Sequence, residues 1–257
     1  MIDKLVGSAT EAVADVTDGC SVAVGGFGLS GIPWILIDAL LRQGATDLSV
    51  VSNNCGVDGA GLGVLLAEHR IRRVLASYIG ENQEFARQYL GGEVQVELTP
   101  QGTLAERLRA GGSGIAAFFT PTGVGTMVAD GGLPWRYDDA GQVAIASPPK
   151  EVRTFGLGGV DREYVLEEGI VTDFALVRAA VADRHGNAVF HAAAQNFNPA
   201  VAMAGRVTVL EAERVVEPGA IDPDHVHLPG VFVQRVVALT PEQAADKRIE
   251  KRTVTQR

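Results

Sequence analysis

The sequence predicts an α/β protein: a parallel-rich sheet wrapped by helices, with a more irregular, strand-rich second half. Through the first half, short apolar runs alternate with segments of helical spacing, which is the pattern of parallel strands joined by crossover helices. Many of the 31 glycines stand at the junctions between these strands and helices, where loops carry function. The second half is less regular: within residues 130–165, short apolar runs are broken by Gly-Gly and Pro-Pro pairs, so we expect smaller strands there.

The elements of the first half follow from apolar runs of strand length and from longer segments with apolar residues three or four apart. A helical segment opens the chain, and strands and helices then alternate, as they do around a parallel sheet. The expected strands are 20–24, 48–51, 72–77, 93–98 and 114–119, and the expected helices are 3–16, 33–43, 60–69, 82–90 and 104–110.

The second half is predicted from turn formers and from a few strongly apolar runs. It opens with a loop of turn residues and a region of several short strands, and its most apolar strand comes later, before a turn. In order, the expected segments are the loop 120–126, short strands within 130–165, the strand 174–182, the turn 183–187, and strands at 188–190, 207–210 and 231–239.

Length and composition bound the class of protein. The 257 residues, of which 46% are hydrophobic, suffice for a large core, and we expect one domain over residues 1–240 and a charged C-terminal tail over 241–257. The formal net charge of −9 argues against nucleic acid as a partner. No apolar run is long enough to cross a bilayer, so we expect no membrane partner. The absence of a signal pattern and the presence of only two cysteines favour a cytoplasmic location.

The stretch Gly25–Pro33 is the most informative in the chain. It reads Gly-Gly-Phe-Gly-Leu-Ser-Gly-Ile-Pro and directly follows the apolar run Val22–Val24, so a glycine-rich turn connects a buried strand to a helix. Pro33 suits the first position of that helix. Because a helix start that faces a ligand favours negative charge, a phosphate, a carboxylate or a thioester oxyanion would suit this turn.

Residues 26–31 also have the spacing G-x-G-x-x-G, which makes an NAD-binding oxidoreductase an alternative. That fold uses an acidic residue about 20 residues further on, at the end of the next strand, to bind the ribose hydroxyls. Here the expected strand ends in Ser52-Asn53-Asn54, and the nearest acids, Asp47 and Asp58, lie before and beyond that place. The dinucleotide interpretation is therefore disfavoured. A turn needed only for packing stays a further alternative.

Several ordered blocks along almost the whole chain carry a family resemblance. The first consists of Asp18-Gly19, the glycine-rich turn and Pro33. The others, in order, are Val51–Asp58, Tyr78–Asn82, Glu97–Arg107, Phe119–Gly123, Asp173–Leu176 and Lys247–Arg252. Together they resemble the A (α) chains of the family I coenzyme A transferases, of the 3-oxoacid type, and many blocks in order are more specific than a single glycine-rich loop.

The resemblance implies an enzyme that moves CoA between succinyl-CoA and acetoacetate by ping-pong chemistry, through a glutamyl–CoA thioester. It also implies that the nucleophilic Glu lies on a B subunit in a Glu-Asn-x-Gly context, that the assembly is α2β2, and that no cofactor is needed besides the CoA thioester substrate. Glu81-Asn82 begins like that context but lacks the glycine, so we expect Glu81 to be a solvated acid at a helix start. A 3-oxoadipate or short-chain fatty acid transferase stays open, as does a non-catalytic CoA- or carboxylate-binding protein.

Gln101 is the candidate catalytic residue of this chain. It stands between a predicted strand end and a helix start, and the family gives the matching Gln the role of stabilising the thioester oxyanion. The alternative is a side chain that caps its local turn. Gly25, Gly26, Phe27 and Gly28 are expected to line the carboxylate pocket with backbone N–H groups and one aromatic ring.

The remaining candidates are polar residues with competing structural roles. Asn53 and Asn54 are expected to hydrogen-bond a small acid or, alternatively, to serve as turn residues. His225 and His227 alternate on one face, but without a third convergent ligand no metal site is expected. Cys55 lies among the candidate residues, and its reactivity depends on its exposure.

Overall fold

The computed structural model describes residues 2–247, and its centre is a nine-stranded sheet. Along the main path of this sheet, every pair of neighbouring strands is parallel. In spatial order these strands are β1 (Leu5–Val6), β14 (Arg235–Ala238), β13 (Gly205–Val216), β11 (Thr172–Asp183), β2 (Ser21–Val24), β3 (Leu48–Val51), β4 (Ile71–Ala76) and β5 (Gln95–Leu98). The short β12 (Ala188–Val189) pairs with β11 in the antiparallel sense. The predicted parallel-rich α/β fold is therefore confirmed.

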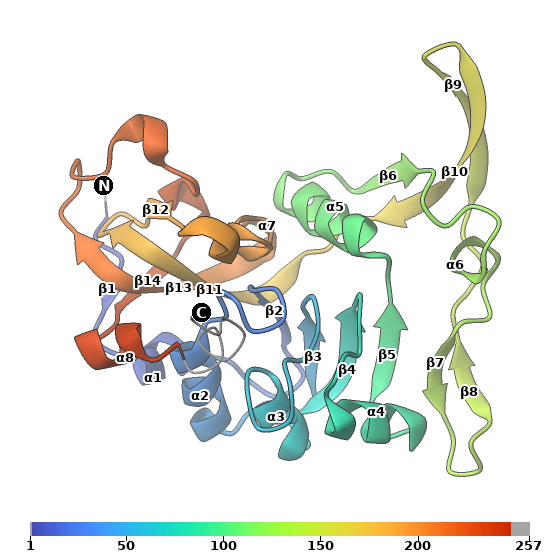
Figure 1. Cartoon of the computed structure of the whole chain (residues 1–257), viewed down its shortest axis with the longest axis horizontal. Helices are drawn as coiled ribbons and strands as arrows, with labels where there is room; N and C mark the ends of the chain where they lie inside the picture. Colours follow the sequence, from blue (N-terminus) through green and yellow to red (C-terminus); the bar gives the residue numbers. More distant parts are fainter. Residues whose placement is uncertain (1, 248–257) are drawn as a thin grey trace, which may run out of the picture.

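Helices cover both faces of the sheet, as Figure 1 shows. Along β2, Val22 and Val24 point to one hydrophobic core and Ala23 to the other, because successive side chains of a strand alternate between faces. The first core is closed by α1 (Ala9–Ala12), α2 (Trp34–Gln43), α3 (Gly63–Ala67) and α4 (Gln83–Leu90), and the second by α5 (Gln101–Gly112) and α7 (Asn198–Ala204).

The second half also builds an arm that extends from the main sheet (Figure 1). Its segments form a three-stranded antiparallel sheet and a separate hairpin. They are β6 (Ala117–Thr120), β10 (Val160–Glu168) and β9 (Val152–Leu157) in the sheet, β7 (Pro134–Tyr137) and β8 (Val143–Ala146) in the hairpin, and α6 (Met127–Asp130) between them. The prediction of small strands in this region is confirmed, but β6 does not join the parallel sheet.

The prediction of a helix over residues 3–16 is wrong for most of this segment. Leu5 and Val6 instead form β1, which pairs with β14 at the sheet edge. Only four residues of the segment are α-helical. Ser8 is the N-cap of this helix and accepts a hydrogen bond from the backbone N–H of Glu11, and Val13 is its C-cap. Pairing with a strand far away in the sequence overrides the local helical spacing here.

The expected strand over 231–239 is also shorter than predicted. Pro229 leads into the 3₁₀ turn η3 (Gly230–Phe232), where Val231 is exposed, and only β14 pairs with its neighbours. The helix α7, which follows the 3₁₀ turn η1 (Ala192–Gln195), is not predicted from the sequence. Another 3₁₀ turn, η2, covers Pro223–His225.

The strand order reverses between β2 and β11. From β2 the chain builds outward through β3, β4 and β5, whereas β11, β13 and β14 extend the sheet on the other side. In open parallel sheets, ligands bind beyond the carboxyl ends of the strands at such a reversal. The glycine-rich stretch Gly25–Pro33 leaves β2 at this point, so the fold brings it to the place where a site is expected.

The expected tail begins with α8 (Pro241–Ala245), whose first turn is closed by a capping box between Thr240 and Gln243. The rest of the predicted charged cluster Lys247–Arg252, from residue 248 on, lies outside the described residues. Within residues 2–247, no helix is both long and apolar enough to span a membrane.

Candidate functional site

Three polar side chains meet at the carboxyl edge of the sheet. Asn53 follows β3, Ser77 follows β4, and Gln101 follows β5 as the first residue of α5. Since β3, β4 and β5 are neighbours and parallel, their carboxyl ends lie side by side. The helix α5 begins at Gln101, three residues before the predicted start, because Pro100 has the extended backbone of an N-cap.

The side-chain amide of Gln101 is held by its oxygen. Oε1 accepts a hydrogen bond of 2.8 Å from Nδ2 of Asn53 and a second one from the hydroxyl of Ser77. Asn53, which is only 4% exposed, in turn accepts a hydrogen bond of 2.9 Å at Oδ1 from the backbone N–H of Gly28. The structure therefore joins the glycine-rich loop to Gln101 through one buried side chain.

The amide nitrogen of Gln101 faces the other way. No hydrogen bond joins Nε2 to any of the residues 2–247, and the side chain is partly exposed. Two N–H donors at the start of a twelve-residue helix, where the helix dipole is positive, suit an acceptor that carries negative charge. The geometry therefore offers a donor pair to an oxyanion that approaches this edge.

The glycine-rich loop is a closed turn. Phe27 and Ser30 exchange two backbone hydrogen bonds, of 3.1 and 3.0 Å. The N–H of Gly25 donates to the carbonyl of Leu176 on β11, and that of Gly28 donates to Asn53. The expectation of free N–H donors along Gly25–Gly28 is therefore corrected at three of its four residues, because the turn and its neighbouring strands already use these donors.

Two of the glycines in this loop are required for steric reasons. A Cβ on Gly25 would lie 2.0 Å from Oδ1 of Asn198, and Gly26 has a φ of +106° together with a close approach to Ile32. Asn198, the fully buried first residue of α7, donates 3.0 Å to the carbonyl of Gly31 and accepts 3.2 Å from the N–H of Arg178. Asn198 was not predicted, although the dipeptide Asn198-Pro199 is a turn signal.

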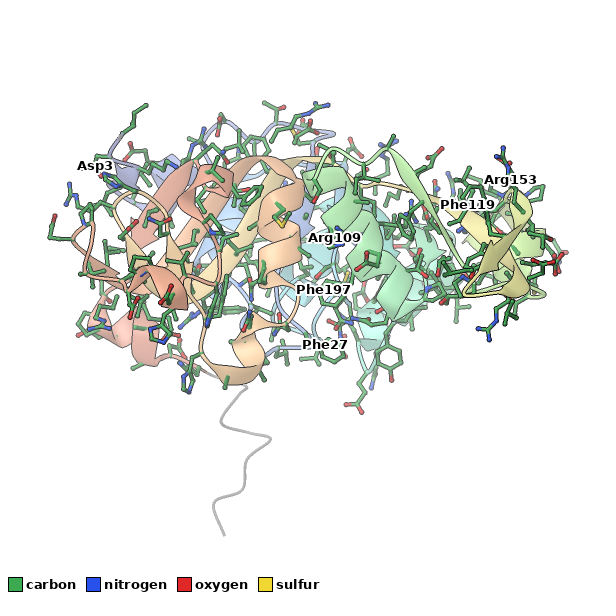
Figure 2. The ribbon with its side chains drawn as sticks, turned by 90° about the horizontal axis from the view of Figure 1, so that it is seen from above. Asp3, Phe27, Arg109, Phe119, Arg153 and Phe197 are labelled. Atoms are coloured by element: carbon green, nitrogen blue, oxygen red, sulfur yellow. The ribbon has the colours of Figure 1, made fainter. Side chains whose placement is uncertain are left out.

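A cavity of about 510 Å³ opens beside the loop, where the strand order reverses. It is lined by Phe27–Gly31, by Arg178–Ala180 of β11 and by His191–Ala194, with Glu213 and Lys247 at its charged side. Phe27 is 52% exposed, so its ring is available to a ligand or a partner chain. Figure 2 shows Phe27 far from Phe119 and Arg153, which mark the arm.

Buried charges support the helix that follows the loop. Arg178 of β11 contacts Glu211 at 3.2 Å and Glu213 at 2.9 Å, both on β13. Glu211 is fully buried and accepts a hydrogen bond from the N–H of Leu36 in the first turn of α2. Burial raises the pKa of Glu211 to about 7, against the opposing effects of Arg178 and the helix N–H groups.

The other candidates of this edge have structural roles. Oδ1 of Asn54 accepts the N–H of Gly56 at 3.0 Å, as the turn alternative predicts. Cys55 is fully buried, and burial raises the pKa of its thiol, so no reactive thiolate is expected. Glu81 is exposed, as expected, directly before Asn82, which caps α4 by accepting the N–H of Phe85 at 2.8 Å.

The acid and histidine candidates also have local explanations. The carboxylate of Asp58 accepts the N–H groups of Gln83 and Glu84 at the start of α4, so it is committed to a helix start rather than to a ribose. Nδ1 of His227 accepts the N–H of Phe190 at 3.1 Å, and His225 lies at the surface beside Asp222. Within residues 2–247, no three His, Cys, Asp or Glu side chains converge as metal ligands.

Known proteins share both the sequence and the fold. The family described as Coenzyme A transferase matches residues 6–239. A protein of Mycobacterium tuberculosis (strain H37Rv), named as the A subunit of a probable succinyl-CoA:3-ketoacid coenzyme A transferase, is 64% identical over 99% of this chain and 100% of its own length. The human mitochondrial succinyl-CoA:3-ketoacid coenzyme A transferase 2 is 50% identical over 98% of this chain, which spans 47% of the human protein.

Solved structures agree with the architecture. An acyl-CoA transferase of Escherichia coli O157:H7 superposes with a TM-score of 0.74 at 24% identity, over 94% of this chain and 48% of that one. Glutaconate coenzyme A-transferase from Acidaminococcus fermentans superposes with a TM-score of 0.73 at 21% identity, over 94% of this chain and 77% of that one. At these identities the structures establish the fold alone. The family match over residues 6–239 and the mycobacterial relative show that this chain belongs to the coenzyme A transferase family.

Proposed function

We propose that this chain is the A (α) component of a 3-oxoacid CoA-transferase that moves CoA between succinyl-CoA and acetoacetate. The observation that best supports this proposal is the side-chain amide of Gln101, which turns two N–H donors outward at the carboxyl edge of the sheet. The choice of substrates rests on the names of relatives such as the mycobacterial protein, which is 64% identical over its whole length.

The nucleophile of this proposal belongs to a B subunit. No carboxylate among residues 2–247 forms a hydrogen bond with Gln101, Asn53 or Ser77. This chain also spans about half of the human relative, whose single polypeptide is therefore long enough to contain a second part of similar size. A Glu from a partner chain, facing Gln101, completes the site.

The proposed chemistry proceeds in balanced steps. The Glu carboxylate attacks the carbonyl of succinyl-CoA, the C–S bond breaks, and a mixed anhydride and the CoA thiolate result. The thiolate then attacks the glutamyl carbonyl and releases succinate, which leaves a glutamyl–CoA thioester. Acetoacetate reverses the sequence and leaves as its CoA ester. Each addition places negative charge on a carbonyl oxygen, and the N–H donors of Gln101 stabilise that charge.

The test mixes this chain with a B subunit that carries the Glu-Asn-x-Gly context. We expect exchange of CoA between succinyl-CoA and acetoacetate, and a hydroxylamine-sensitive CoA adduct on B. An adduct on this chain would contradict the division of labour. A higher kcat/KM with 3-oxoadipate or a short fatty acid would move the activity to that acid, and binding without exchange would indicate a carboxylate- or CoA-binding protein.

The assembly and the compartment are also proposals. We expect an α2β2 heterotetramer, which the mass of the purified complex by light scattering checks. Both cysteines are free thiols, which supports a cytoplasmic location, where thiols stay reduced.

A further inference from the structure

We propose that Ser77, together with Asn53, is a positioning residue that fixes which end of the Gln101 amide faces the reacting carbonyl. This inference rests on the proposed function for the identity of the reaction, but its structural part is independent of it. An amide side chain has a donor end and an acceptor end of almost the same shape, so its orientation is set by hydrogen-bond partners. Only the donor end stabilises an oxyanion.

The orientation begins with a backbone donor. The N–H of Gly28 cannot reverse its polarity, and it lies 2.9 Å from Oδ1 of Asn53. If Asn53 were turned over, its NH₂ group would face this N–H, and two donors would meet inside the protein. Gly28 therefore sets Asn53 with its oxygen toward the loop and its nitrogen toward Gln101.

Asn53 and Ser77 pass this polarity on. Nδ2 of Asn53 lies 2.8 Å from Oε1 of Gln101 and 3.1 Å from the hydroxyl oxygen of Ser77, and that hydroxyl also contacts Oε1. A reversed Gln101 would turn its NH₂ group toward the NH₂ group of Asn53. Because Asn53 is 4% exposed, water is a poor substitute for the missing acceptor.

Asn53, Ser77 and Gln101 follow three successive strands, β3, β4 and β5. The hydrogen bonds among these three side chains, here called the relay, form only because the strands are neighbours. The hydroxyl oxygen of Ser77 also lies 3.0 Å from the carbonyl oxygen of Asn53. Its single proton is therefore shared between that carbonyl and Oε1 of Gln101. Ser77 thus acts through Gln101 and needs no contact with substrate.

The experiment compares S77A with S52A in the complex with B. Ser52 is a matched control: it directly follows β3, is 4% exposed, and donates its hydroxyl to the carbonyl of Val24 at 2.9 Å, with no hydrogen bond to Gln101. We expect S77A to lower kcat about tenfold with little change in KM, since one orienting hydrogen bond is lost. S52A stays within about twofold of the parent, and S77T, which keeps the hydroxyl, recovers most of the rate.

A double-mutant cycle locates the effect at Gln101. In a Q101A background, S77A should cost no further rate, because there is no amide left to orient. An equal loss of rate from S77A in both backgrounds would overturn the proposal, as would equal losses from S77A and S52A.

A second readout does not depend on activity. In ¹⁵N-labelled full-length chain, the side-chain NH₂ resonance of Gln101 is identified by its disappearance in Q101E. We expect S77A to shift this resonance and S52A to leave it in place. If S77A shifts this resonance but the complex shows no CoA exchange, the proposed function would be contradicted and the relay would still be supported. An unchanged resonance in S77A would overturn the relay, whatever the activity.

Discussion

At the scale of single residues, the feature that matters at the site is which of its N–H donors lack a hydrogen-bond partner. Gly25, Phe27 and Gly28 use their N–H groups inside the protein, whereas the amide nitrogen of Gln101 has no partner among residues 2–247. Nε2 of Gln101 is not one of the buried unpaired side-chain atoms of residues 2–247, so it is open to an approaching acceptor. We therefore expect the loss of Gln101 to affect chemistry strongly, with an added cost in stability because Asn53 and Ser77 lose their acceptor.

Replacing Gln101 with Ala should lower kcat of the assembled enzyme about 10²- to 10³-fold, the usual cost of one oxyanion donor. The measurement is steady-state exchange with the B subunit, with thermal unfolding as the control for folding. A variant with parent-like kcat would show that the oxyanion is stabilised by other groups.

Replacing Gly25 with Ala tests the packing of the loop. The new methyl group would meet Asn198, whose side chain holds Gly31 and the backbone of Arg178, so we expect a loss on the order of 3 kcal/mol in the free energy of unfolding. Gly102 is the matched control, since a Cβ there meets nothing within 4 Å and the residue is helical.

G102A should be neutral or slightly stabilising, because Ala favours a helix over Gly. Urea unfolding of both variants gives the comparison. Equal stabilities for G25A and the parent would mean that Asn198 can move without cost.

At the scale of elements, the helix α2 begins on a buried charge. Glu211 of β13 accepts the N–H of Leu36 in the first turn of α2 and contacts Arg178 of β11, so one carboxylate ties a helix start to two strands. A carboxylate is favoured near a helix N-terminus, but its full burial opposes ionisation. The balance makes this contact sensitive to pH.

The direction in which stability changes with pH follows from the raised pKa of Glu211, which is about 7 against 4.5 for an ordinary Glu. Between these pH values the folded protein binds a proton that the unfolded chain has lost. The contribution to stability is therefore complete below about pH 4.5 and is lost as the pH rises through 7.

We therefore expect the parent to lose stability relative to E211Q between pH 5 and 7, by at most ~1.4 kcal/mol per pH unit. Urea unfolding at several pH values measures the difference between the two proteins, in which the contributions of other titrating groups cancel. Parallel stability curves would show that Glu211 stays ionised throughout this range.

The elements also show what could be read from the sequence. The strands around Val22–Val24 and Val50–Val51 were predicted because apolar β-branched runs end in turn formers. The short α7 and the edge strand β1 were not, because few residues carry their signal and pairing across the sheet decides their state. The start of α5 was displaced for a different reason, because the N-cap at Pro100 begins this helix earlier than its apolar spacing indicates.

The residues of the candidate site likewise fall into those that the sequence predicts and those that it does not. Gln101 and Asn53 were predicted because polar residues stand after strands in a recognisable block, and the structure brings the two together. Ser77 and Asn198 were missed, since a lone Ser or Asn has no periodicity, and only the strand order or the α7 packing places it at the site.

At the scale of the whole molecule, the chain combines a well-packed body with an arm of different character. β2 and β11 are buried between helices, whereas every residue of β8 and β9 is exposed. Apolar side chains remain at the surface of the arm, among them Phe155 and Leu157. Local stability follows buried contacts, so the two parts should open at different rates.

Hydrogen exchange followed by mass spectrometry should give the fastest exchange among paired strands in β8 and β9, and the slowest in β2 and β11. The isolated full-length chain is the sample, at a single pH. Comparable protection in β9 and β11 would mean that the arm opens only with the body.

The outward-facing amide of Gln101 has a consequence for fidelity. A reacting carbonyl at an open sheet edge is within reach of water, and hydrolysis would then compete with transfer to the second acid. Within residues 2–247 the donor pair has no hydrogen-bond acceptor, and the Gln101 side chain is partly exposed. The tightness of the junction with the partner chain, rather than any side chain described here, would then set how many CoA esters are wasted for each one exchanged.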